Sequence, residues 1–432
     1  MTKELRIKAL RDIQKNQNNI VRPGIPIVYK GERRAFNAYK IPLVDLIYNK
    51  YNGRISSSVK SFEKQYRELN PENEKDKERI EQFLWESKED RNKQTMESLV
   101  EIGQQVHGIV TSDGVIIDGN RRAMLLNRIW NDRSEWRKKK NHNVDECQYF
   151  VAVILPDNAD KKEVLRLETT YQMGEDKKLD YNAIEKYLKC KDLKAEGFSE
   201  ADIAKMMSEE ESEVKKWLRI MKLMDEYLSS LDYKGIYTRL EKREGQFVDL
   251  TAYLASYEAA NGNSRVSWDY DEGDLADLKA ISFDYIRAQY EGKEFRLLAK
   301  PSKKESFFCN KKVWSDFRDR HFKFIDTISE KPLKELRKES PDGDLSKLLK
   351  ARDDEWKERA KDALKENLSR SETKLGNINE SNRPLELAHK AKDALDSINT
   401  DVDAFFSAKV NDILNEITKV VAEYQKLIKK GK

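Results

Sequence analysis

The residues with the clearest capacity for chemistry lie between positions 111 and 128. Asp113-Gly114 separates two short apolar runs, Asp118-Gly119 follows, and two consecutive arginines, Arg121 and Arg122, come next. Guanidinium groups match the geometry of phosphate and carboxylate, with which they form paired hydrogen bonds. A glycine just before them permits backbone conformations that bring main-chain amides close to an anion. The stretch therefore predicts an anion site, with phosphate as the favoured ligand.

Local patterns indicate which elements would position this site. Asp-Gly between the apolar residues 109–110 and 115–117 is a strong signal for a β-hairpin. From Arg121 onward the apolar residues recur at three-and-four spacing, which predicts a helix. The first turn of a helix carries amides without an acceptor inside the helix, and these attract negative charge. An ordinary turn followed by solvent-exposed arginines is the alternative reading.

Length and composition limit the class of protein. A chain of 432 residues predicts about two or three domains. The 82 basic and 78 acidic residues give a net charge of +4, which neither favours nor excludes nucleic-acid binding. The 37% of charged residues and only 9 prolines favour a helix-rich chain. Cys147, Cys190 and Cys309 are too far apart to indicate a disulfide framework or a zinc cluster. Since no apolar run is long enough to cross a bilayer and no apolar signal segment follows Met1, we expect a cytoplasmic protein without membrane contact.

The order of strand, Asp-Gly, strand and then Gly-x-x-Arg at a helix start resembles the signature of the ParB/sulfiredoxin fold. Residues 113–122 carry this resemblance most clearly, and it extends over about 41–230. Gly31-Glu-Arg-Arg also matches a form of this motif that ParB proteins use, but no Asp-Gly hairpin leads into it. Gly31 is therefore kept only as the second candidate for the signature glycine. The sulfiredoxin branch needs a cysteine after the signature glycine, where this chain has Asn120. The resemblance therefore points to the ParB-like branch.

The ParB-like resemblance implies that a nucleoside triphosphate, CTP or ATP, binds with Mg²⁺. Its phosphates would be held by Gly119, Asn120, Arg121 and Arg122. Arg54 follows the segment 41–47, which resembles the opening strand of the family, and is a candidate contact to the base or to a phosphate. An exposed loop arginine is the alternative.

Residues 165–172 resemble the second phosphate motif of the same family, Glu-Asn-x-x-Arg. Glu168 matches the glutamate and is the candidate magnesium ligand and, together with Asp118, the candidate catalytic residue. Thr169 stands where the family has asparagine, and no arginine follows at the matching place, so Gln172 is the nearest polar substitute. A neutral amide cannot replace a cation that faces phosphate.

Residues 179–221 resemble the segment with which ParB proteins enter and form a helix-turn-helix. Ser199 predicts a helix cap, and Lys215, Lys216 and Arg219 on the third helix are the candidate DNA contacts. That helix begins with four glutamates among residues 209–213, and carboxylates repel DNA phosphates. A three-helix unit that packs without reading bases is therefore the alternative.

The predicted fold class is α+β, with a small ParB/sulfiredoxin-like mixed sheet domain, a helix-turn-helix unit and a mostly helical C-terminal half. The predicted domains are an N-terminal arm (1–40), a nucleotide-binding domain (41–175) with a helical insertion (60–93), a helix-turn-helix-like domain (176–232), a helical domain (233–330) and a charged helical hairpin or coiled-coil tail (331–432). The apolar residues between 410 and 427 keep a three-and-four spacing, which is typical of an antiparallel helix pair or of a dimerising coil.

We therefore predict a ParB-like protein of prokaryotic or phage type that binds a nucleotide and DNA, forms a homodimer and is a candidate nucleoside triphosphatase. One alternative is a metal-dependent nuclease in which Asp113, Asp118 and Glu168 bind the metal, although the sequence lacks a tight carboxylate or histidine cluster. The other alternative is a non-enzymatic DNA-binding regulator or scaffold of a mobile element or phage-defence system, whose C-terminal helices bind a partner protein.

Overall fold

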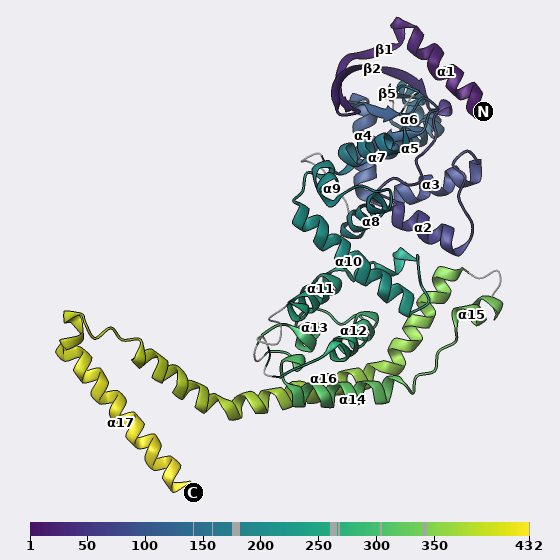
Figure 1. Cartoon of the computed structure of the whole chain (residues 1–432). Helices are drawn as coiled ribbons and strands as arrows, with labels where there is room; N and C mark the ends of the chain where they lie inside the picture. Colours follow the sequence, from purple (N-terminus) through teal and green to yellow (C-terminus); the bar gives the residue numbers. More distant parts are fainter. Residues whose placement is uncertain are drawn as a thin grey trace.

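A five-stranded mixed sheet forms the N-terminal part of the chain, and helices form the rest (Figure 1). The α+β class predicted from the sequence is confirmed. The computed structural model describes residues 1–140, 142–157, 159–174, 182–259, 266, 268–302, 305–339 and 344–431. The beginning of the segment 179–188, which resembles the family's entry into the helix-turn-helix, lies outside these ranges. Among the described helices, none is long and apolar enough to cross a membrane.

The strands lie in the order β1-β2-β5-β3-β4, with β3 and β5 parallel and the other neighbours antiparallel. Their bounds are Ile20–Tyr29 (β1), Glu32–Pro42 (β2), Gly108–Val110 (β3), Ile116–Asp118 (β4) and Tyr149–Ile154 (β5). The segment 1–40 therefore differs from the arm that we predicted, because it contains α1 (Lys3–Lys15) and the hairpin of β1 and β2. Gly31 lies in the turn of that hairpin with a φ of 80° and leads into a strand, whereas an anion site of the predicted kind needs a helix.

Both faces of the sheet carry buried side chains, although much of the β1–β2 hairpin is exposed. Successive residues of a strand point to opposite faces, so Ile116 packs with α5 on one side while Ile117 packs with α7 on the other. The helices of this part are α2 (Ser56–Gln65), α3 (Glu74–Glu86), α4 (Glu89–Ile102), α5 (Asn120–Asn131), α6 (Arg133–Lys140) and α7 (Lys161–Met173). The charged insertion predicted at 60–93 is helical, as α2, α3 and the start of α4. Because α5 and α7 cover opposite faces, residues from both can meet only at an end of the sheet.

One cluster of buried side chains extends from Met173 to Leu375 and forms the core of the helical body. The helices are α8 (Ala183–Ala195), α9 (Glu200–Met207), α10 (Glu211–Ser230), α11 (Glu244–Glu258), α12 (Glu272–Arg287), α13 (Gly292–Ala299), α14 (Lys311–Ile325), α15 (Leu333–Glu339), α16 (Leu345–Asp396) and α17 (Ala408–Lys430). The predicted boundaries after residues 232 and 330 fall within this continuous core. Beyond it, α16 extends away and carries α17 with it (Figure 1).

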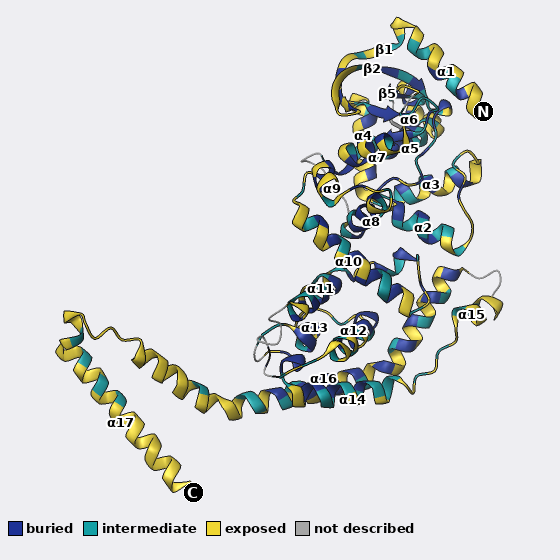
Figure 2. Cartoon of the chain, viewed as in Figure 1, coloured by how far each residue is buried: buried dark blue, intermediate teal, exposed yellow. Residues whose placement is uncertain are grey.

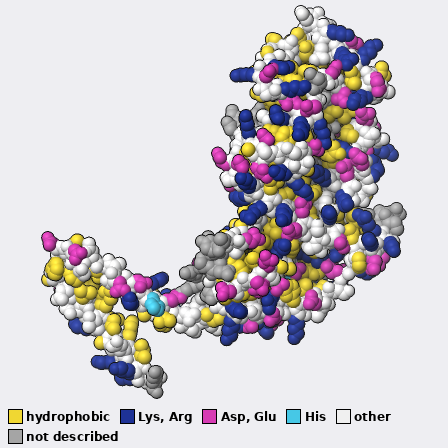
Figure 3. Space-filling view, in the orientation of Figure 1, with side chains coloured by type: hydrophobic (Ala, Val, Ile, Leu, Met, Phe, Trp, Pro, Cys, Tyr) yellow, Lys and Arg dark blue, Asp and Glu magenta, His cyan; other side chains and the backbone are white. Residues whose placement is uncertain are grey.

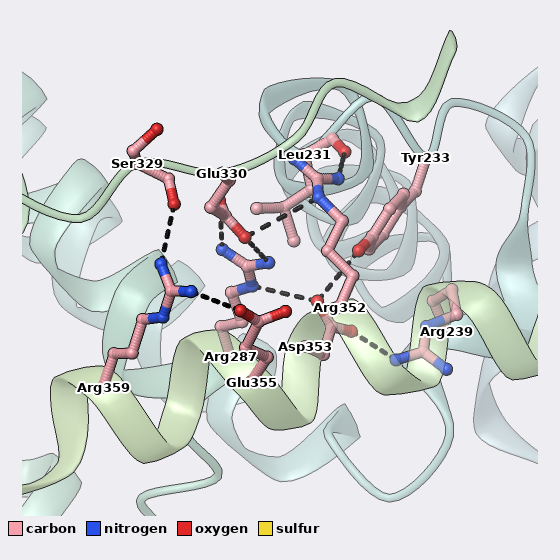
Figure 4. A network of polar contacts seen from close by, with 10 residues as sticks. All are labelled: Leu231, Tyr233, Arg239, Arg287, Ser329, Glu330, Arg352, Asp353, Glu355 and Arg359. Atoms are coloured by element: carbon pink, nitrogen blue, oxygen red, sulfur yellow. Dashed lines mark hydrogen bonds and ion pairs between the residues drawn. The ribbon is translucent and has the colours of Figure 1, made fainter. Parts of the chain in front are cut away.

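A buried polar network fixes α16 to the body (Figure 4). Asp353 of α16 accepts hydrogen bonds from Arg287 Nε and Tyr233 Oη, both at 2.9 Å, and pairs with Arg239. Arg287 also donates to both oxygens of Glu330, at 2.8 and 2.6 Å. Burial alone would raise the pKa of Asp353, but the two arginines hold it below its usual range. Removing one partner would leave a buried charge unpaired, so this network is a strong constraint on the position of α16.

Glu185 of α8 connects the helical body to the sheet domain. Its carboxylate accepts hydrogen bonds from the backbone amide of Ser57, at 3.2 Å, and from the Ser57 hydroxyl, at the start of α2. The side chain is buried, and burial raises its pKa to about 7 although the Ser57 hydrogen bonds act in the opposite direction. The connection is therefore sensitive to pH near neutrality.

We expect the free energy of unfolding to decrease as the pH rises from about 4.5 to about 7, because the folded state keeps the Glu185 proton that the unfolded chain has already released. The shift corresponds to roughly 3 kcal/mol across this interval. Urea unfolding at several pH values should show a flatter dependence for Glu185→Gln than for the unmodified chain. Glu97→Gln, at an exposed position of α4, is the control and should keep the original dependence. Equal slopes for the unmodified chain and Glu185→Gln would contradict the assignment.

Candidate functional site

A pocket of about 310 Å³ lies where β3 begins, β4 ends and α5 begins, and α7 contributes to its wall. Its lining residues come from four segments of the chain and are Asn52, Arg54, Val106, His107, Ile109, Asp118, Gly119, Asn120, Arg121, Arg122, Tyr171 and Gln172. The structure thus brings Arg54, residues 118–122 and Gln172, all predicted from the sequence, to one pocket. Asn52, His107 and Tyr171 were not predicted as site residues.

Two glycines shape the corner between β4 and α5. Gly119 is the N-cap of α5 and has a φ of 108°, a conformation that residues with a β-carbon rarely adopt. A Cβ atom on Gly119 would lie 2.5 Å from Cζ of Phe150, and one on Gly108 would lie 2.3 Å from the same atom. The Phe150 ring therefore occupies the space beside both glycines. The helix can start directly after the strand, so its first-turn residues lie at the pocket.

Two side-chain amides hold the loop that carries Arg54. The buried Asn120 accepts a hydrogen bond from the backbone N–H of Asn49, at 3.2 Å, and donates one to the Asn49 carbonyl, at 2.9 Å. Gln172 donates to the Ile117 carbonyl at 2.6 Å and accepts from the Gly53 amide at 3.3 Å. Both amides were predicted as phosphate contacts, and the structure shows them bound to backbone groups. Their effect is to position Arg54 beside the start of α5.

The two consecutive arginines have different surroundings. Arg122 lies 2.7 Å from Asp118 and also donates to the backbone carbonyls of His107, at 3.0 Å, and Val106. It therefore closes one wall of the pocket and neutralises the only carboxylate among the lining residues. Arg54 and Arg121 line the pocket in addition to this ion pair. The charged residues in the pocket lining are thus three arginines and one aspartate.

Glu168 and Thr169 belong to the junction between α7 and α8 and are not among the residues that line the pocket. Glu168 is buried and forms an ion pair of 3.0 Å with Lys189, which is also buried. Burial raises the pKa of Glu168, although Lys189 acts in the opposite direction. The Thr169 hydroxyl donates to the Leu165 carbonyl of its own helix, at 2.8 Å. The predicted roles of these two residues in phosphate and magnesium binding do not correspond to these contacts.

The carboxylates of this region do not form a metal site. In the part of the chain that the structure describes, no three His, Cys, Asp or Glu side chains are grouped to hold a metal ion. Asp113, Asp118 and Glu168 each have a cationic partner, which is Lys3, Arg122 and Lys189 respectively. These residues therefore do not fit the Mg²⁺ that the ParB-like resemblance implies.

The helices α9 and α10 are joined by a short turn at Ser208, which has a φ of 55°. A capping box between Ser199 and Asp202 begins α9. On α10 the three predicted DNA contacts are exposed, and each has an acidic neighbour: Lys215–Glu211 at 2.6 Å, Lys216–Glu213 at 3.3 Å and Arg219–Glu258 at 3.8 Å. The arrangement is compatible with a helix-turn-helix, but its cations are partly neutralised.

The pocket at the start of α5 is the site with the most convergent chemistry. Comparisons with protein-family models, with curated proteins and with solved structures find no match. The geometry and charge of this pocket are therefore the basis on which a function is proposed below.

We expect Gly119→Ala to destabilise the protein strongly, because alanine would be strained at a φ of 108° and its Cβ would overlap Phe150. Gly24→Ala is the matched control, since Gly24 has a φ of 70° but a Cβ atom added there would meet nothing within 4 Å. Backbone strain alone costs roughly 1–2 kcal/mol, and the overlap should bring the cost at Gly119 to about 3 kcal/mol or more. Urea unfolding measures both values, and equal costs would mean that Phe150 does not press against this corner.

Proposed function

We propose that this protein binds the phosphate groups of a nucleotide in the pocket at the start of α5. The observation that carries the proposal is the convergence of Arg54 and Arg121 on the first turn of a helix. Amides at a helix start and forked guanidinium donors both favour phosphate. The one lining carboxylate, Asp118, is already neutralised by Arg122, so it does not oppose an anion.

The size and the remaining walls of the pocket favour a small molecule with an apolar or aromatic part. A volume of about 310 Å³ lies at the lower end of the range for small-ligand sites. Val106, Ile109 and Tyr171 supply apolar and aromatic surface beside the cationic side. A nucleobase can stack on an aromatic ring such as that of Tyr171. CTP and ATP remain the candidates that the ParB-like resemblance supplies.

The proposal concerns binding and does not include hydrolysis or DNA cleavage. Glu168 and Asp118, the two candidate catalytic residues, are both engaged in ion pairs, and Glu168 does not line the pocket. In this pocket Arg54 and Arg121 would neutralise the phosphate charge that a protein-bound Mg²⁺ neutralises elsewhere. A nuclease would need carboxylates that share a metal ion, and the described residues contain no such group.

We expect Arg121→Ala to abolish the rise in melting temperature that a bound nucleotide causes, because a ligand stabilises the folded state by an amount that falls to zero as its concentration drops well below its dissociation constant. The panel contains CTP, ATP, GTP and UTP, each with Mg²⁺ and with EDTA, and binding should persist in EDTA. Arg128→Ala is the control, since Arg128 lies on the same helix but stacks over the Trp85 ring, outside the pocket lining.

The outcomes separate the parts of this proposal. No stabilisation of the unmodified chain by any of the four nucleotides would refute it. An unchanged shift in Arg121→Ala would place the site elsewhere. Binding that disappears in EDTA would show that a metal ion is required, which contradicts the proposal that the arginines neutralise the phosphates in place of Mg²⁺.

DNA binding through α10 is a second candidate function. The observation that favours it is an open groove of about 850 Å³ beside α11, along which Lys215, Lys216, Arg219 and Lys222 all lie. The acidic neighbours of the first three reduce the attraction that phosphates would feel. We therefore propose that any DNA contact here is weak, dependent on salt and independent of sequence.

We expect the double substitution Lys215→Ala and Lys216→Ala to weaken the binding of every DNA duplex by a similar factor. Each lost phosphate contact should reduce the slope of log affinity against log salt by about 1. Fluorescence anisotropy at several salt concentrations measures both effects. Glu210→Gln with Glu211→Gln should act in the opposite direction, and unchanged affinity in both double variants would exclude α10 as the DNA surface.

A further inference from the structure

Residues 376–431, which we call the arm, extend away from the helical body. The arm contains the end of α16, the short 3₁₀ turn at Asp403–Phe406 and the whole of α17. Leu375 is the last buried residue of α16, and α17 has no buried residue at all. Figure 2 shows the arm almost entirely in the colour of exposed residues. Beyond Ile378, which packs against the core, its hydrophobic side chains are open to solvent, and Figure 3 shows such side chains gathered in patches along the arm.

The apolar residues of α17 follow a strict seven-residue repeat. Val410, Ile413 and Leu414 begin the pattern, and the residues seven and fourteen positions further on are again apolar. They form a stripe three positions wide, whereas a two-stranded coiled coil needs only two positions of each heptad. Ile413, Tyr424 and Ile428 are 55%, 61% and 68% exposed. A continuous apolar stripe of this kind marks an interaction surface.

The end of α16 carries a second stripe. Leu385, Leu387 and Leu395 of α16 are exposed, and so is Ile398, which follows the C-cap of the helix. Leu387, Ala391 and Leu395 lie four residues apart in turn and therefore along one face of α16. Each arm thus presents two amphipathic helices joined by a short connection. Packing them against each other would still leave part of the wider α17 stripe exposed.

The repeat and the charges favour helices rather than a membrane as the partner. A strict seven-residue repeat drifts around a straight helix by about 20° per heptad, which suits supercoiled helices but not a flat surface. The polar side of α17 also mixes Asp412, Glu416 and Glu423 with its lysines. An anionic membrane surface favours a predominantly basic polar face.

The area favours a second copy of the same chain. With a rise of 1.5 Å per residue, α17 and the exposed end of α16 together present roughly 800 Å² of apolar stripe, which matches the contribution of one partner to a standard specific interface. The α17 stripe alone would provide only about half of this area. Two arms contribute four helices, and a four-helix arrangement can cover stripes that are three positions wide. Twofold dimers are also the commonest closed assembly.

From these observations we infer that the arm is a dimerisation element, and that two arms associate as a four-helix bundle. The nucleotide pocket lies in the sheet domain at the other end of the molecule and takes no part in this contact (Figure 1). The inference therefore does not depend on the proposed nucleotide binding.

The test is the mass of the full-length chain in solution, measured by sedimentation equilibrium over a wide concentration range. We expect a dimer with twice the chain mass of 50.6 kDa. Ile413→Lys with Val420→Lys places two charges in the stripe and should give a monomer. Asn415→Lys with Ala422→Lys adds the same charges at the same spacing on the polar side of α17 and should leave the dimer intact.

Misfolding does not complicate this comparison, because no residue of α17 contributes to a buried core. Circular dichroism should show the same helical content in both double variants. A monomeric unmodified chain at every concentration would overturn the inference, as would a dimer that persists in Ile413→Lys with Val420→Lys. Flotation of the unmodified chain with vesicles of phosphatidylglycerol and phosphatidylcholine would assign the stripe to a membrane and would also overturn it.

Discussion

The contact between Phe150 and two glycines is the constraint on which the candidate site depends. Phe150 lies on β5, near the middle of the sheet, and its ring fills the space beside Gly108 on β3 and Gly119 at the end of β4. Because glycine has no side chain, the backbone at both positions can lie directly against the Phe150 ring. Only one residue, Gly119, then separates the end of β4 from the start of α5. The position of the first turn of α5 in turn decides where Arg121 and Arg122 lie. The anion site that we propose, made of helix amides and arginines, therefore depends on a packing requirement inside the sheet.

Ion pairs around the pocket determine its charge. The carboxylate of Asp118 is paired with Arg122 and that of Glu168 with Lys189, so the acidic residues nearest in sequence to the predicted phosphate motifs are neutralised. The Glu168–Lys189 pair is buried, and a buried pair contributes little net stability although each partner is needed, because the other would remain as an uncompensated charge. The effect of both pairs on function is indirect, since both carboxylates are already engaged with cations of the same chain. The same pairing explains why these carboxylates do not suit a metal ion.

Local patterns in the sequence predicted the strands around Asp113-Gly114, the glycine corner at Gly119 and the helix that follows, because these depend on neighbouring residues. The hairpin of β1 and β2 was not predicted, because Pro23 and Pro26 interrupt the strand pattern. Proline has no backbone N–H to donate, but β1 is an edge strand, where the loss of that donor costs little. The roles of Asn120 and Gln172 could not be predicted. Their backbone partners lie 71 and 119 residues away in the sequence, and no local pattern encodes such a distance. For the same reason, the ion pair between Lys189 and Glu168 could not be predicted from the sequence.

The helix α8 links the helical body to α2 and to α7, the helix that contributes to the pocket wall. Glu185, Lys189 and Asp192 lie four and three residues apart, which places them on one face of α8. They contact Ser57 of α2, Glu168 of α7 and Lys60 of α2 respectively. Glu168 lies one helical turn before Gln172, which lines the pocket and binds the loop of Arg54. A shift of α7 at the pocket must therefore move α8 as well or break a buried ion pair at a cost of about 3–5 kcal/mol. Since the second course costs a large part of the stability of a typical domain, the sheet domain and the first helices of the body should move as one unit.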